Sequence, residues 1–178
     1  APLLARQPFP DDWRVIGVLD PRQQGLSGED ERRALAALPA LPQAAAADLC
    51  HQVLMRVLPG AAESSFAPFA DGVTRLQQVL GQHFAPAQQG SAYASPAVGR
   101  LMDWLMDWRV HSEHRAALGQ SSWGPTAFAI VPGAEAAEVM LAGARAARRV
   151  DPALIVRVVR GRNHGALLSP AVLRGHRD

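Results

Sequence analysis

The chain has 178 residues, 48% of them hydrophobic, which is enough for one core of ordinary size and cramped for two. The formal net charge is only +2 and the basic residues are spread along the chain, so composition gives no electrostatic support for nucleic-acid binding. All 18 basic residues are arginine, which excludes a lysine Schiff base and a P-loop lysine. We therefore expect a single domain over 1–178.

The first predicted elements are one strand and two helices. Residues 13–20 are rich in β-branched and aromatic side chains and are flanked by prolines, which is typical of a strand. A capping-box pattern at Ser27 predicts a helix that continues to about Leu38. Apolar residues at helical spacing predict a second helix over 44–58, with Cys50 buried on it.

Two longer helices follow, separated by a loop. The apolar spacing predicts a helix over 65–83, whereas residues 85–94 show no period and are expected to form a loop. Ser95 and Pro96 supply an N-cap and a first helical residue. The apolar stripe that follows predicts a largely buried helix to about His114, with its tryptophans packed in the core.

The remaining elements are a strand, a helix and a strand. Residues 126–131 are short and apolar, and a helix is expected from Gly133 to about Ala146. Residues 153–159 are almost continuously apolar, which predicts a strand at the centre of the sheet. This order predicts a mixed α/β fold in which helices cover one face of a sheet.

The loop between Gly119 and Thr126 has the greatest density of chemically useful groups. It reads Gly-Gln-Ser-Ser-Trp-Gly-Pro-Thr and lies between a helix and an apolar strand. Glycines let successive backbone N–H groups point at one spot, and such nests bind phosphate or carboxylate with help from hydroxyls. The alternative is a tight Gly-Pro turn whose polar side chains are satisfied internally, and composition alone does not decide between the two.

This octapeptide, followed by an apolar strand, resembles the signature of the β-ribofuranosylaminobenzene 5'-phosphate synthases, which are relatives of the GHMP kinases. Other segments resemble that family in the same order: the strand at Trp13, then 25–29, 66–69, Gln77 or Gln78, Gly81, 84–86 and 88–90. The resemblance implies a GHMP-kinase C-terminal-like α+β domain with a ferredoxin-like sheet covered by helices. It also implies that the N-terminal GHMP domain, with the superfamily's phosphate-binding motif, is absent from this chain.

The resemblance implies an activity for the complete protein. The family reaction is the decarboxylative transfer of ribose 5-phosphate from phosphoribosyl pyrophosphate to 4-aminobenzoate or 4-hydroxybenzoate, in tetrahydromethanopterin biosynthesis. Mg²⁺ is the implied cofactor, with no organic cofactor. The small-molecule substrate is expected to bind at these residues: Gly119, Gln120, Ser121, Ser122, Trp123, Gly124, Thr126, Gln89 and Gly90.

Different roles are expected within that set, and no catalytic residue is assigned. The hydroxyls of Ser121, Ser122 and Thr126 suit hydrogen bonding to an anionic group, and the two loop glycines suit a close approach of backbone to ligand. The Trp123 indole suits stacking on an aromatic acceptor.

A second anion site is predicted directly after the last strand. Its residues lie beside glycines at the end of a strand, where ligands of α/β sheets gather, although a plain exposed connection fits equally well: Arg160, Arg162, Asn163 and His164. By contrast, His111, Glu113 and His114 fit a solvated helix end better than a metal site, so no metal ligands are predicted.

Two other functions remain open: a non-catalytic ligand-binding or dimerisation domain on a GHMP scaffold, and a GHMP-type small-molecule kinase. The single cysteine and the lack of a long apolar run or signal-like start favour a cytoplasmic protein that does not enter a membrane. Exposed sheet edges would favour a homodimer.

Overall fold

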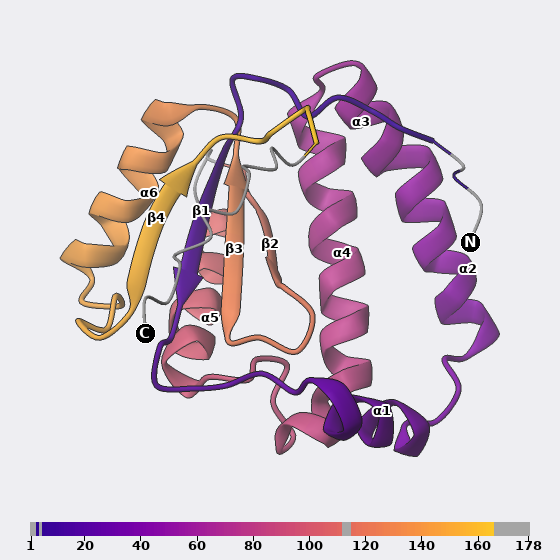
Figure 1. Ribbon diagram of the computed structural model, residues 1–178. Coiled ribbons are helices and arrows are strands. Elements are labelled where there is room, and N and C mark those ends of the chain that lie inside the picture. The colour runs from indigo at the N-terminus through magenta and orange to yellow at the C-terminus, as the bar shows by residue number, and fades with distance from the viewer. Residues whose placement is uncertain (1–2, 4, 112–114, 166–178) are drawn as a thin grey trace, which may run out of the picture.

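The structure is a computed structural model that describes residue 3, residues 5–111 and residues 115–165. Four antiparallel strands form one sheet in the order β2-β3-β1-β4 (Figure 1). The strands are β1 (Arg14–Leu19), β2 (Ala117–Gln120), β3 (Thr126–Val131) and β4 (Ile155–Val159). Helical segments connect β1 to β2 and β3 to β4, which gives the βαββαβ order of the expected ferredoxin-like arrangement.

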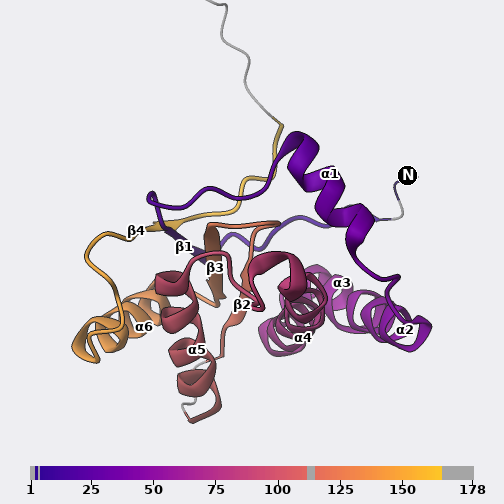
Figure 2. The same cartoon turned by 90° about the horizontal axis from the view of Figure 1, so that it is seen from below.

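The first connection is long and contains most of the helices. They are α1 (Gly28–Ala37), α2 (Gln43–Gln52), the π-helical turn η1 (Val53–Val57), α3 (Leu58–Ala62), α4 (Phe66–Phe84), the 3₁₀ turn η2 (Ala85–Gln88) and α5 (Pro96–His111). The second connection is α6 (Ala134–Ala146). Figure 2 shows α4, α5 and α6 side by side below the sheet.

The main core lies between the sheet and the helices α5 and α6. The alternating residues Ile16 and Val18 of β1 point into it, as do Ala127, Ala129 and Val131 of β3. They meet a helical stripe made by Val98, Leu101, Met102 and Leu105 of α5 and by Met140 of α6. Trp104 and Trp108 pack against this cluster from α5, as predicted.

A second cluster of buried hydrophobic residues packs α4 against the sheet. Trp13 is 3% exposed, and its ring centroid lies 4.5 Å from that of Phe69 and 5.0 Å from that of Phe66. Ala117 and Ile130 complete the contact from β2 and β3. The amino-terminal end of α4 is therefore held by aromatic packing.

Side chains of α4 cover the outer edge of β2. Thr74 Oγ1 accepts a hydrogen bond from the Leu118 N–H at 3.1 Å and donates to the Ala116 carbonyl at 3.4 Å. Gln77 Oε1 accepts from the Gln120 N–H at 3.1 Å. These bonds satisfy edge groups that would otherwise pair with another strand.

Three sequence predictions need correction. β2 lies in a region that was expected to be loop or helix end, because four residues are too few to show a period. β4 is an edge strand, not the central one, and most of its residues are exposed. Cys50 is exposed, and the helix predicted over 44–58 continues through η1 into α3.

The other elements agree with the prediction to within a few residues. The strand over 126–131 and the helix that begins at Pro96 are confirmed, and α1 begins at Gly28. Ser27 is the N-cap of α1, but its side chain makes no capping hydrogen bond. Within the described residues, no helix has the length and apolar content needed to cross a membrane.

Candidate functional site

The loop between β2 and β3 is a tight turn over 121–124. The Ser121 N–H donates to the Thr126 carbonyl at 2.8 Å, and the Gly124 N–H donates to the Ser121 carbonyl at 3.0 Å. Ser122 and Gly124 have φ values of 50° and 68°, and the peptide bond before Pro125 is cis. Two of the amides considered for an anion nest are therefore used inside the turn.

The indole of Trp123 packs inward. Its side chain is 4% exposed, and its Nε1–H donates to Glu31 Oε1 of α1 at 3.0 Å. Its ring centroid lies 4.7 Å from that of Phe84 at the end of α4. Trp123 thus ties the turn to α1 and α4, which does not match the exposed stacking surface that we expected for an aromatic acceptor.

The segment at Gly25 lies directly against the turn. A Cβ atom at Gly25 would lie 2.9 Å from the Trp123 carbonyl oxygen and would overlap the Gly124 carbonyl. Only glycine permits this approach without a shift of backbone. Two of the segments that carry the family resemblance are therefore in contact.

Gln120 joins two more of those segments, at Gln77 and Gln88, and also bonds Ala94. Its Oε1 accepts from the Ala94 N–H at 2.8 Å, and its Nε2 donates to Gln88 Oε1 at 2.9 Å and to the Ser122 carbonyl at 3.1 Å. Its backbone N–H is bonded to Gln77. Gln120 is only 8% exposed, so the side chain of this predicted binding residue connects neighbouring segments by buried hydrogen bonds.

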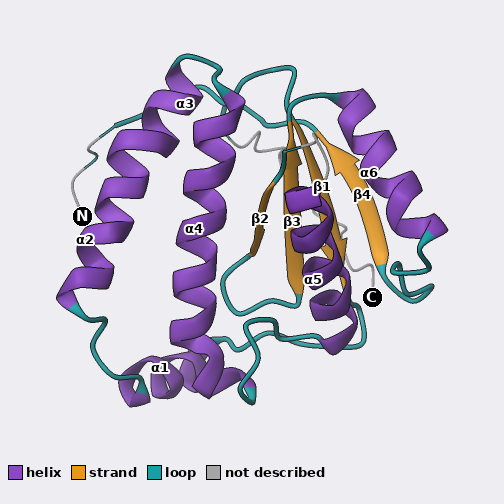
Figure 3. Ribbon diagram, turned by 180° about the vertical axis from the view of Figure 1, so that it is seen from behind, coloured by secondary structure: helices purple, strands orange, loops and turns teal. Residues whose placement is uncertain are grey.

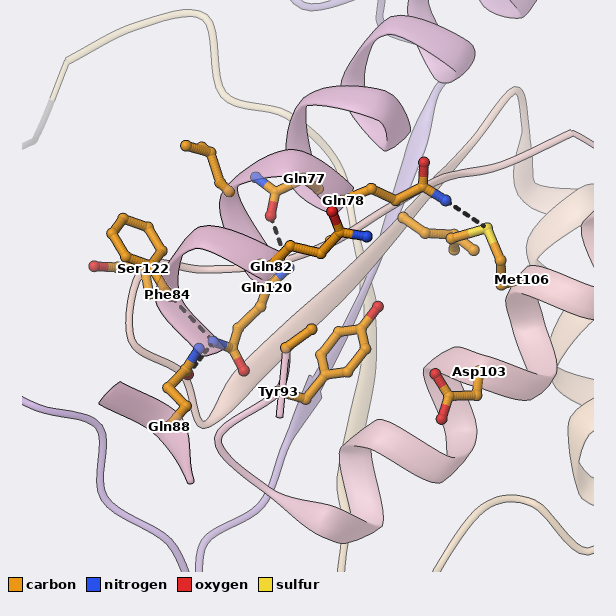
Figure 4. A pocket seen from close by; sticks show the side chains of 15 residues that line it. Gln77, Gln78, Gln82, Phe84, Gln88, Tyr93, Asp103, Met106, Gln120 and Ser122 are labelled. Atoms are coloured by element: carbon orange, nitrogen blue, oxygen red, sulfur yellow. Dashed lines mark hydrogen bonds between the residues drawn. The ribbon is translucent and has the colours of Figure 1, made fainter. Parts of the chain in front are cut away.

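A cavity of about 250 Å³ opens beside Gln120, between α4 and α5 and over β2. Figure 3 shows the two helices on either side of that strand. Its polar lining is dominated by glutamine residues, with one serine from the turn: Gln77, Gln78, Gln82, Gln88, Gln120 and Ser122. Tyr93 and Asp103 complete the polar lining, and the apolar part includes Leu80, Phe84, Met106 and Leu118 (Figure 4).

Only some of the predicted substrate-binding residues line this cavity. Gly119, Gln120 and Ser122 line it, whereas Ser121, Trp123 and Gly124 of the turn and Thr126 of β3 are outside its lining. Gln89 and Gly90 have φ values of 58° and 82° and form the exposed end of η2, outside the lining. Tyr93, Gln82 and Asp103 were not singled out from the sequence, since a loop without a period and two exposed helix positions give no signal.

The electrostatics of the cavity disfavour anions. No arginine or histidine is among the described residues that line it, and Asp103 contributes a carboxylate. Burial, and to a smaller degree the charge of Asp103, raises the pKa of Tyr93 to about 12. The phenol is therefore neutral at physiological pH and acts as a hydrogen-bonding group.

The buried Asp20 carboxylate forms an ion pair with Arg22 and a hydrogen bond with Ser95. Asp20, which follows β1, is 1% exposed; it accepts from Arg22 Nε at 2.8 Å and from Ser95 Oγ at 2.6 Å. These hydrogen bonds, that of Arg22 first, hold the pKa of Asp20 far below its ordinary value. Ser95 Oγ also accepts from the Val98 N–H at 3.2 Å and so caps α5. The sequence predicted this cap but not its buried partner.

The second predicted anion site is partly assembled. Arg162, Asn163 and His164 border a shallow hollow of about 440 Å³ together with Arg6, whereas Arg160 is not among its lining residues. The Asn163 amide is occupied: its Oδ1 accepts from the Phe9 N–H at 2.7 Å and its Nδ2 donates to the Phe9 carbonyl at 2.9 Å. Arg162 Nε donates to His164 Nδ1 at 3.0 Å.

No group of three or more His, Cys, Asp or Glu side chains that could hold a metal occurs within the described part of the chain. Of the three residues weighed as ligands, Glu113 and His114 lie outside the described residues. Asp103 is the one carboxylate among the described residues of the cavity wall. The described residues of the cavity wall do not form a protein-built Mg²⁺ cage, which requires several oxygen ligands.

Two curated proteins resemble this chain over most of its length. The beta-ribofuranosylphenol 5'-phosphate synthase of Methanothermobacter thermautotrophicus is 26% identical over 170 residues, which cover 94% of this chain and 46% of that protein. The protein of the same name from Archaeoglobus fulgidus is 31% identical over 130 residues, covering 73% of this chain and 36% of that protein. The chain is a homologue of these synthases. It spans less than half the length of each relative, and no protein-family model matches it.

Solved structures confirm the fold. The mevalonate diphosphate decarboxylase of Enterococcus faecalis matches with a TM-score of 0.56 and 11% identity, over 85% of this chain and 46% of that one. A structure described as MDDEF in complex with MVAPP matches with a TM-score of 0.59 and 13% identity, over 85% and 46%. The synthase homologue therefore has the α/β, GHMP C-terminal-like fold that the sequence predicted.

Proposed function

We propose that the full-length protein is a β-ribofuranosylphenol 5'-phosphate synthase and that this chain supplies one wall of its active site. The observation that carries the proposal is the match to two synthases over 94% and 73% of the chain. It is supported by the way the resembling segments meet: Gln77, Gln88 and the turn after β2 converge on Gln120.

The proposed reaction joins ribose 5-phosphate to a benzene ring. In phosphoribosyl pyrophosphate the bond between C1 of the ribose and the pyrophosphate oxygen breaks, and its electron pair leaves with pyrophosphate. The ring carbon that carries the carboxylate bonds to C1 of the ribose. The bond to the carboxylate then breaks, carbon dioxide leaves, and the electron pair restores the aromatic ring.

The acceptor that we propose is 4-hydroxybenzoate. Loss of its carboxylate leaves a phenol, as in the names of both relatives. Mg²⁺ would be carried mainly by the oxygens of the pyrophosphate, with the protein contributing few ligands, and would neutralise charge on the leaving group. The phosphate groups would bind to the part of the full-length protein that this chain does not span, because the described cavity carries no cationic side chain.

The test is product formation by the full-length protein with phosphoribosyl pyrophosphate, Mg²⁺ and carboxyl-labelled 4-hydroxybenzoate. We expect labelled carbon dioxide and a ribosylated phenol in equal amounts, both dependent on the pyrophosphate donor. A parallel reaction with 4-aminobenzoate tests the acceptor. Phosphorylation of a small molecule from ATP, without release of carbon dioxide, would instead support the kinase alternative.

Variants of the turn test the roles of its side chains. We expect Ser122→Ala, in the cavity wall, to reduce product formation more than Ser121→Ala, in the turn but outside the lining. If both variants were as active as the unmodified protein, the loop hydroxyls would have no role in the proposed site.

A further inference from the structure

We propose that Glu31 of α1 is a positioning residue for the wall that this chain supplies to the active site, and that it acts through the indole of Trp123. Glu31 is not among the residues that line the cavity, and it lies 92 positions before its partner in the chain. The inference rests on the proposed function, because it assumes that the cavity between α4 and α5 belongs to the active site.

The first step is the hydrogen bond between the two side chains. Trp123 is 4% exposed, and its Nε1–H is the single polar group of its side chain. This N–H donates to Glu31 Oε1 at 3.0 Å. A buried donor without an acceptor is costly, so the buried position of the indole depends on the acceptor that α1 supplies.

The second step is the contact between the indole and the cavity wall. The ring centroid of Trp123 lies 4.7 Å from that of Phe84, which lines the cavity. The preceding residue, Ser122, also lines the cavity, and its carbonyl accepts from Gln120 Nε2 at 3.1 Å. A displaced indole would therefore move two lining residues, Phe84 through ring packing and Ser122 through the backbone.

The third step is the way in which α1 is attached. Figures 1 and 3 show this helix at the carboxyl-terminal end of α4, and none of its ten residues is buried. Its first turn has three acidic side chains. Glu29 and Asp30 each form an ion pair with the arginine three positions later in the same helix, whereas Glu31 bonds to Trp123. Glu31 is thus the acidic residue of this turn that connects α1 with the site.

Matched variants separate this bond from other effects of the substitution. Glu31→Leu keeps a side chain of similar size and removes the acceptor, whereas Glu31→Gln keeps an oxygen that can accept from the indole. Glu29→Leu is the control, because its carboxylate is 73% exposed and lies in the same helical turn. Both leucine variants remove one negative charge from the same end of α1, so their effects through the helix dipole are alike.

The first readout is the kinetics of the full-length protein with 4-hydroxybenzoate and phosphoribosyl pyrophosphate. We expect Glu31→Leu to raise the KM for 4-hydroxybenzoate and to lower kcat/KM about tenfold, and Glu31→Gln and Glu29→Leu to stay within about twofold of the unmodified protein. A loss of folded enzyme alone would lower kcat and leave the KM unchanged. After Trp123→Phe, which removes the donor, Glu31→Leu should have little further effect, since both substitutions break one bond.

The second readout is hydrogen exchange of the Trp123 indole N–H in the full-length protein, followed by NMR after ¹⁵N labelling of tryptophan. Its signal is the one that disappears in Trp123→Phe. We expect exchange at least about tenfold faster in Glu31→Leu and unchanged in Glu29→Leu, because the bond protects the N–H. If Glu31→Leu does not fold, Trp123→Phe must itself raise the KM for 4-hydroxybenzoate.

Equal effects of Glu31→Leu and Glu29→Leu, or an unchanged KM in Glu31→Leu, would overturn the inference. Unchanged indole exchange in Glu31→Leu would overturn it as well. Faster exchange with an unchanged KM contradicts the positioning role alone. If the unmodified protein releases no carbon dioxide from 4-hydroxybenzoate, it is the proposed function that fails.

Discussion

The pKa of Tyr93 is a measurable property that depends on the electrostatics of the cavity. Its phenol is half-buried next to the Asp103 carboxylate, so both surroundings oppose the formation of a second negative charge. A folded-state pKa above the ordinary value of 10.0 means that neutral Tyr93 contributes stability below about pH 10. This contribution is lost as the pH rises towards the folded-state pKa.

The near-ultraviolet absorbance of tyrosinate should therefore report a single group in the folded chain, with a pKa of about 12. Asp103→Asn removes the smaller of the two causes and should lower the pKa only part of the way towards its ordinary value. Ionisation at the ordinary pKa in the folded protein would mean that the phenol is more solvated than the structure indicates.

Asp20 is the second residue with a clear pH signature. Because its folded-state pKa is depressed, the hydrogen bonds from Arg22 and Ser95 stabilise the fold above the unfolded-state pKa of about 4. That stability is lost as the pH falls further. Asp20→Asn should therefore lower the free energy of unfolding at neutral pH, and the difference from the unmodified chain should shrink in acid.

Ser95→Ala tests the same network from its other side. It removes one bond to a buried carboxylate and the cap of α5, so we expect a loss of roughly 1–3 kcal/mol in urea unfolding at neutral pH. Ser27→Ala is the matched control, because Ser27 is an N-cap without a side-chain bond. Equal effects of the two substitutions would contradict the assignment of the Asp20 network.

At the scale of elements, the contact between α4 and β2 is the critical one. A Cβ atom at Gly119 would lie 2.7 Å from Gln77 Oε1 and would overlap the rest of that side chain, which covers the β2 edge. A Cβ atom at Gly143 in α6 would make ordinary contacts with Trp104 and Trp108, at 3.5 and 3.7 Å.

The same substitution should therefore have opposite effects at these two glycines. We expect Gly119→Ala to destabilise the chain by about 1–2 kcal/mol, because Gln77 must move and the Gln120 N–H loses its partner. Gly143→Ala should stabilise it by roughly 0.5–1 kcal/mol, since alanine favours the helix. Chemical denaturation of both variants measures this, and loss of stability at both positions would show that α6 is packed more tightly than described.

The sequence predicted elements with a strong internal period and missed those defined by their neighbours. β1, β3 and the main helices have alternating or helical patterns of sufficient length. β2 is only four residues long, and its outer edge is satisfied by Thr74 and Gln77, about forty positions earlier in the chain. No local pattern encodes such a partner.

The same limit applies to the candidate site. The octapeptide signature located the turn correctly, and Gln120 and Ser122 do line the cavity. The prominent Trp123, however, packs inward, while Tyr93 comes from a segment that shows no period. Composition identifies which groups are present, whereas tertiary contacts decide which of them face a ligand.

At the scale of the whole molecule, β4 is an edge strand of the sheet that the described residues form. The strand lies at the edge, and Ile155, Val158 and Val159 are 41%, 44% and 49% exposed. An exposed apolar edge strand offers unpaired backbone groups to another chain. This observation gives the predicted homodimer a specific surface.

We expect the 178-residue chain to associate in a concentration-dependent way in sedimentation equilibrium, and Val158→Arg to shift it towards monomer. Val139→Arg, at a similarly exposed position of α6, should associate like the unmodified chain. A monomer at all concentrations would contradict the prediction.

The central claim is that the cavity between α4 and α5 forms the wall that this chain supplies to the active site of the full-length protein. The most direct measurement is the KM of that protein for 4-hydroxybenzoate and for phosphoribosyl pyrophosphate, in the Gln82→Leu variant and in the control Gln43→Leu, at an exposed position at the start of α2. We predict that Gln82→Leu raises the KM for 4-hydroxybenzoate about tenfold, which corresponds to one lost hydrogen bond, and leaves the KM for the donor unchanged. Unchanged KM values for both substrates, or a selective rise for the donor, would contradict it.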